Sequence, residues 1–117
     1  MNTDVVNVTQ LAVLASLVDG QASQQEIDTI AKSVSERFDI SEADIKTLAE
    51  KLVATHTKKN LNRHPVAIVR LGVRSLQNLT GRNKRIAMQI AKDVAEASDG
   101  VDANEAMFLQ ELASFAK

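Results

Sequence analysis

The chain has 117 residues, of which 44% are apolar and only three, all phenylalanine, are aromatic. This length predicts a single domain over residues 1–117 with a small core. The absence of cysteine excludes disulfides, thiolate metal sites and cysteine nucleophiles. The net charge of −1 conceals a segment of +9 at residues 58–92 between two segments of −5 each, an asymmetry that bears on partners rather than on fold.

The first two predicted helices span residues 4–18 and 24–38. The second half of the first is apolar on nearly every side, which is typical of a central helix surrounded by others. Its longest apolar run, residues 11–18, is far shorter than the ~20 residues that cross a bilayer. No basic leader precedes an apolar run, so we expect a soluble cytoplasmic protein without membrane insertion. The second helix has one apolar stripe at helical spacing, formed by Ile27, Ile30, Ala31, Val34 and Phe38.

A third helix is predicted from a capping box, Ser41 with Asp44, to about His56. The polar residues 57–64 predict the longest connection. Pro65 suits the first turn of a fourth helix, because its missing N–H would be unpaired there in any case.

The fourth helix should end near Leu79, before Thr80 and Gly81. A fifth helix is predicted over residues 83–98, with alanine at every fourth position. A sixth runs from residue 103 to the end and should pack through Phe108, Leu109, Leu112 and Phe115. No β-type alternation competes, so we expect an all-α, compact bundle of six to seven helices.

Two stretches near opposite ends of the chain share one pattern. In each, an apolar helix stops at Asp-Gly, a short loop follows, and a new helix begins at a cap with Glu three residues further on. The glycine suits the left-handed position that ends a helix, and the cap with its Glu predicts a capping box. The residues are Asp19, Gly20, Ser23 and Glu26 in the first copy, and Asp99, Gly100, Asp102 and Glu105 in the second.

The end of one helix and the capping of the next do not explain why residues 19 and 99 are aspartates. Each acid lies at the carboxyl end of a helix, where the macrodipole disfavours a negative charge by ~0.3–1 kcal/mol. One interpretation is an Asx turn, in which the carboxylate accepts an N–H of the following loop. The other is a functional site, since a local rule is broken twice at equivalent places.

Two Asp-Gly helical hairpins in an Ala- and Leu-rich context resemble the TerB-like family of tellurite-resistance proteins. The resemblance covers most of the chain, although the middle helices agree only in being helical. The N-terminal region of a membrane-linked J-domain co-chaperone is similar. The resemblance implies a pseudo-symmetric all-α fold of about seven helices, a role in stress response or tellurite resistance as an interaction module, and acidic residues that bind metal cations.

This sequence departs from the family at Gln21 and Val101, where an acid is more usual. An EF-hand is excluded, because position 12 of the first loop would be Ile30 rather than Glu. A looser divalent-cation site could form if the pseudo-symmetry brings the loops together. Its ligands would be Asp19, Glu26, Asp99 and Glu105.

The basic segment allows several interpretations. The bases could bind phosphates of a nucleic acid or an anionic surface, although no aromatic residue is present for stacking. They could instead form a solvated face, pair with acidic helices of the same or another copy, or dock an acidic protein. This candidate surface comprises Lys58, Lys59, Arg63, Arg70, Arg74, Arg82, Lys84 and Arg85, with Lys92 at the end of the segment.

No catalytic constellation is evident. His56 and His64 are eight residues apart, which is not a metal-ligand spacing, and we interpret both as surface residues of helix ends. Ser23 and Ser41 are explained as helix caps, and no Ser/His/Asp set or phosphate-binding glycine loop is present. We therefore expect a protein that is not an enzyme.

Overall fold

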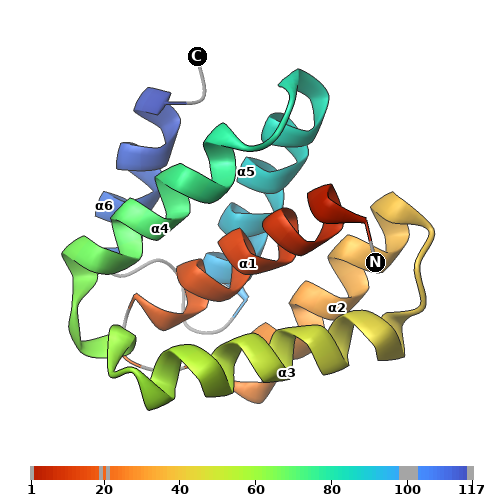
Figure 1. Cartoon of the computed structure of the whole chain (residues 1–117), viewed down its shortest axis with the longest axis horizontal. Coiled ribbons are helices and arrows are strands. Elements are labelled where there is room, and N and C mark those ends of the chain that lie inside the picture. Colours follow the sequence, from red (N-terminus) through yellow and green to blue (C-terminus); the bar gives the residue numbers. More distant parts are fainter. Residues whose placement is uncertain (1, 19, 21, 98–102, 116–117) are drawn as a thin grey trace.

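A computed structural model describes residues 2–18, 20, 22–97 and 103–115 (Figure 1). Within these ranges the chain forms six α-helices, one short 3-10 helix (η1) and no strand. The predicted all-α bundle is therefore confirmed. In chain order the elements are α1 (Thr3–Leu17), α2 (Gln24–Phe38), α3 (Glu42–Lys58), η1 (Leu61–Arg63), α4 (Pro65–Gln77), α5 (Gly81–Glu96) and α6 (Ala103–Phe115).

α1 lies at the centre of the bundle and contacts each of the other five α-helices (Figure 1). Its residues 11–17 are all buried, as the apolar second half predicts. The buried hydroxyls of Thr9 and Ser16 donate to the carbonyl oxygens of Val5 and Val13, each at 2.7 Å, so neither polar group enters the core without a hydrogen bond. In the described part of the chain, no helix is sufficiently long and apolar to cross a membrane.

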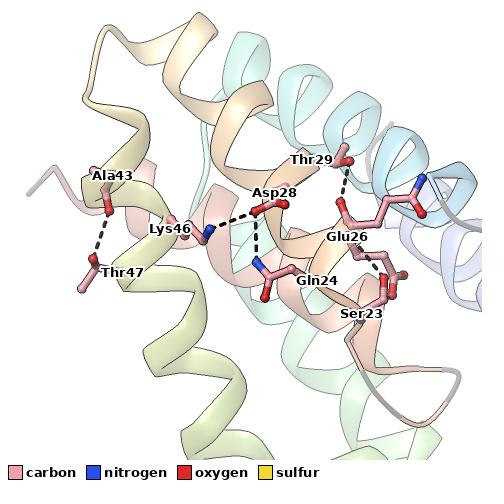
Figure 2. Close-up of polar contacts among 9 residues, drawn as sticks. Ser23, Gln24, Glu26, Asp28, Thr29, Ala43, Lys46 and Thr47 are labelled. Carbon is pink, nitrogen blue, oxygen red and sulfur yellow. Dashed lines mark hydrogen bonds and ion pairs between the residues drawn. The ribbon is translucent and has the colours of Figure 1, made fainter.

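α2 and α3 follow each other through a short connection and pack closely together. A left-handed residue, Asp39 with φ of 54°, ends α2. The Ser41 hydroxyl accepts the Asp44 N–H at 3.3 Å and so caps α3, which is one of the two hydrogen bonds of the predicted capping box. Across the pair, the Lys46 ammonium lies 3.2 Å from the Asp28 carboxylate (Figure 2).

α4 and α6 pack through a glycine. A Cβ atom added to Gly72 of α4 would lie 2.9 Å from Cε1 of Phe108 and 3.3 Å from Cδ2 of Leu112. Both α6 side chains are fully buried. The close approach of the two helices therefore depends on the missing side chain at position 72.

α1 and α5 run side by side in the same direction (Figure 1). Near their starts, the Asn83 amide donates to the Asp4 carboxylate at 2.7 Å. Ala87, Ala91 and Ala95 of α5 are buried, and these small side chains allow the close approach that their spacing predicts. The two hairpins α1–α2 and α5–α6 thus have their first helices aligned, although α1 also contacts α3 and α4, whereas α5 packs mainly on α1, α2 and α6.

Some predicted boundaries and one predicted core residue are wrong. α5 begins at Gly81 rather than at residue 83, and α4 ends at Gln77 rather than near Leu79. Phe115 is 47% exposed, although the α6 stripe predicts that it packs inward. Phe115 is the last residue of α6, where periodicity no longer implies a neighbouring helix.

Candidate functional site

The first Asp-Gly stretch has the predicted stop and restart. The Gly20 N–H donates to the Leu17 carbonyl at 2.9 Å, and Gly20 has a φ of +120°, which L side chains rarely adopt. At the start of α2, the Ser23 hydroxyl accepts the Glu26 N–H at 3.1 Å, and the Glu26 carboxylate accepts the Ser23 N–H at 2.9 Å (Figure 2). The predicted capping box at Ser23 is therefore confirmed.

The glutamates of the two copies have matching environments. Glu26 in the first turn of α2 is 1% exposed, and Glu105 in the first turn of α6 is 3% exposed. A carboxylate at this end of a helix is favoured by the macrodipole. Buried acids are otherwise uncommon unless they are hydrogen-bonded, paired or bound to metal. Both glutamates therefore lie in the first turn of a helix, where a negative charge is favoured, and both are unusually buried for a carboxylate.

The aspartates of the predicted cation site lie outside the described residues. This applies to Asp19 and Asp99, and also to Asp102 and Gly100, so the second capping box stays a prediction. Among the residues that are described, no group of three or more His, Asp or Glu side chains has an arrangement that could hold a metal ion. Glu26 and Glu105 are thus the structurally described half of the predicted ligand set.

One contact connects the two hairpins close to these stretches. The Gln25 amide in the first turn of α2 donates to the carbonyl oxygen of Ala97, the residue that caps α5. Residue 25 follows the first Asp-Gly by five positions, and residue 97 precedes the second by two. The segments that flank the two stretches therefore meet in space, although they are about 70 positions apart in the sequence.

The basic residues lie on the outside of the molecule. Eight of the nine bases in residues 58–92 are exposed, and Lys84 is half-buried. None of the nine forms an ion pair with any carboxylate in the described ranges. Pairing with acidic helices of the same copy, one of the predicted alternatives, is therefore not observed among these residues. The positive charge faces solvent along the end of α3, η1, α4 and α5.

The prediction that both histidines are surface residues is wrong for His56. This side chain is 8% exposed, and its Nε2 lies 3.3 Å from Oε1 of Gln10 on α1. Burial, and secondarily the nearby Lys59 ammonium, lowers the pKa of His56 below its ordinary value of 6.5. His64 is exposed, as predicted. The inward stripe of Ile45, Ala49 and Leu52 continues to position 56 and could have indicated its burial.

Two further features were not anticipated from the sequence. The contact of Gln25 depends on how two distant hairpins pack, so no local pattern could reveal it. Val66 of α4 is 65% exposed, the largest exposure of any large apolar side chain among the described residues. Val66 precedes Arg70 by four residues and therefore lies on the same helix face, so the sequence could have indicated its exposure.

The described elements define a helical bundle in which two similar hairpins are bridged by α3 and α4. A family model described as "Tellurite resistance protein TerB" matches residues 6–116, nearly the whole chain. The chain belongs to the TerB family. No curated protein and no solved structure matches it.

Proposed function

We propose that this chain is a non-catalytic module of tellurite resistance and stress response, which acts in the cytoplasm by binding another protein. Family membership over residues 6–116 is the observation that carries the proposal. The exposed basic residues support the interaction role, because they have no carboxylate partner within the described chain. The setting of His56 against Gln10 supports a packing role for this residue rather than a catalytic one.

We also propose that Asp19, Glu26, Asp99 and Glu105 bind a divalent cation. Carboxylate oxygens are the ligands that Ca²⁺, Mg²⁺ and Mn²⁺ prefer. Two observations support a shared site: Glu26 and Glu105 are both buried, and the contact of Gln25 with Ala97 joins segments that flank the two Asp-Gly stretches.

Growth under tellurite tests the function as a whole. A strain that lacks the gene should lose survival on tellurite, and a plasmid copy of the gene should restore it. Equal survival with and without the gene contradicts a role in tellurite resistance. Survival under a second stress, such as oxidant treatment, tests the stress-response part separately.

Thermal-shift titration with calcium, magnesium, zinc and manganese tests the cation. A ligand that binds the folded state at 100 times its Kd stabilises it by about 2.7 kcal/mol, so the melting temperature should rise with the correct ion. The D19N/D99N variant should lose this rise. E36Q/E50Q is the matched control, because it neutralises two exposed carboxylates elsewhere. An equal rise in D19N/D99N excludes these aspartates as ligands.

A second candidate function is phosphate or nucleic-acid binding by the same basic segment. The nine exposed or half-exposed bases without described acidic partners favour it. The sequence pI of about 6.1 and the lack of aromatic residues in 58–92 argue against it. It predicts mobility shifts of DNA or RNA at low salt that disappear steeply as salt rises. Self-association through opposite charges is tested by light scattering at two ionic strengths.

A further inference from the structure

One face of α4 combines positive charge with an exposed apolar residue. Val66, Arg70 and Arg74 follow each other at four-residue spacing and therefore lie along a single helix face, which we term the α4 face. All three side chains are exposed, Val66 by 65%. The opposite side of α4, through Ile68, Gly72 and Leu76, is buried in the bundle. The α4 face is therefore not part of the core of this copy.

The charges on and around this face oppose local helix stability. Arg70 and Arg74 are like charges one turn apart, which repel each other on a helix surface. Beyond the short connection that follows α4, the first turn of α5 contains bases and no acid, although the macrodipole disfavours positive charge there. Neither arginine forms an ion pair with a described carboxylate. At the start of α5, the Asp4 carboxylate accepts the Asn83 amide and forms no ion pair with a base. The unpaired like charges of the α4 face therefore point to an external anionic partner.

The composition of the face favours a protein over a nucleic acid. Arginine binds carboxylates through a planar fork of donors, and two arginines one turn apart match two carboxylates one turn apart on another helix. An exposed valine adds an apolar contact that phosphates would not use. The molecule as a whole has a net charge of −1, so an extended polyanion would meet acidic segments beyond the basic one.

We propose that the α4 face docks an acidic amphipathic helix of a partner protein. The partner helix presents Glu or Asp at i and i+4 to Arg74 and Arg70, and an apolar residue one turn further on covers Val66. This inference rests on the interaction role proposed above and gives that role a surface and a partner chemistry. Binding of this kind is weak to moderate and decreases with salt, because the charges stay near solvent.

Fluorescence anisotropy with a defined peptide tests the proposal. The probe is a labelled 20-residue alanine-based helix with Glu at i and i+4 and Leu one turn further on. Glu-to-Gln and Leu-to-Ala versions of the peptide, a 20-base-pair duplex DNA and vesicles with anionic lipid are compared at 50 and 300 mM NaCl. We expect the Glu/Leu peptide to bind most tightly and to weaken about tenfold or more between the two salt concentrations.

Two variants separate this face from general electrostatics. R70E/R74E should weaken peptide binding about tenfold or more. K32E/K51E changes the net charge equally, at exposed lysines of α2 and α3, and should leave affinity within about twofold. V66S should weaken binding of the Glu/Leu peptide and not of its Leu-to-Ala version. Circular dichroism and thermal melts verify that each variant is folded.

Several outcomes overturn the proposal. They are no binding of the Glu/Leu peptide at 50 mM NaCl, equal effects of R70E/R74E and K32E/K51E, or tighter binding of DNA or vesicles than of the peptide. Tellurite survival separates this failure from failure of the proposed function. If R70E/R74E restores survival as well as the unmodified gene, the docking face is wrong while the tellurite role stands.

Discussion

His56 shows how one polar residue is accommodated between α1 and α3. Its ring is almost fully buried, and Nε2 lies 3.3 Å from the Gln10 side-chain oxygen. Burial disfavours the imidazolium ion, and the Lys59 ammonium adds a like charge nearby, so the pKa of His56 is lowered. The folded protein therefore holds this side chain neutral at a pH where the unfolded chain already protonates it.

The resulting linkage predicts a loss of stability on mild acidification. The free energy of unfolding should be at its full value above pH 6.5 and should decrease as pH falls through 6.5, because the unfolded state then binds more protons. Chemical unfolding at steps between pH 7.5 and 5.5 measures this slope. H56Q should flatten the slope, whereas H64Q, at an exposed position, should keep it. Equal slopes in both variants would contradict the assignment to His56.

A network on the surface of α2 illustrates a different residue effect. The Gln24 amide donates to Asp28 at 3.0 Å, and Lys46 of α3 lies 3.2 Å from the same oxygen (Figure 2). Hydrogen bonding by Gln24, and then by Lys46, lowers the pKa of Asp28. This carboxylate is open to solvent, so its ion pair with Lys46 contributes little to the stability of the fold.

At the scale of elements, the contact of α4 with α6 depends on Gly72. A helix interior normally gains up to ~1 kcal/mol when Gly is replaced by Ala. At this position the new Cβ would lie 2.9 Å from the buried Phe108 ring, and overpacking of a core costs about 1–3 kcal/mol. The cost of overpacking should therefore outweigh the gain in helix propensity at this position.

We expect G72A to lower the free energy of unfolding by up to about 2 kcal/mol, the cost of overpacking minus the gain in helix propensity. Urea unfolding, followed by circular dichroism, measures it. G81A is a suitable control, because a Cβ at this position in α5 would meet nothing within 4 Å. The control should be neutral or up to ~1 kcal/mol more stable. A G72A variant as stable as G81A would show that α6 retreats from α4 without penalty.

The helices themselves were largely predictable from local patterns. α2 has the bounds that its apolar stripe and its cap at Ser23 indicate, and Pro65 begins α4 as expected. The start of α5 is not predicted correctly, because Thr80 and Gly81 indicate the end of α4 in the sequence, whereas Gly81 is the first residue of α5. Glycine near a helix end is compatible with either a stop or a start, so only the packing decides.

At the scale of the molecule, stability should depend most on α1. Leu14 is fully buried in the helix that contacts all five others. L14A should lower the free energy of unfolding by about 2–5 kcal/mol, a large part of the ~5–15 kcal/mol available to such proteins. L109A, at a half-buried position of α6, should cost less. Urea melts of both variants give the comparison, and an equal loss would contradict the central role of α1.

The arrangement of the hairpins was predictable only in part. The repeated Asp-Gly pattern predicts two helical hairpins, and α1–α2 and α5–α6 follow each other across these stretches. It did not indicate that Asn83 would bond to Asp4, or that Gln25 would reach Ala97, because both contacts depend on tertiary packing of segments more than 70 positions apart. The exposure of the basic residues likewise required the fold, since charge patterning alone left internal pairing open.

The alignment of α1 with α5 also has a consequence for synthesis on the ribosome. The most apolar helix of the chain is made first, but its aligned neighbour begins only at Gly81. At a translation rate of ~5–20 residues per second, the nascent α1 waits on the order of 3–13 s before synthesis of that neighbour begins. During this interval α2, α3 and α4 can cover α1 only in part, so the emerging chain exposes apolar surface that is prone to aggregation.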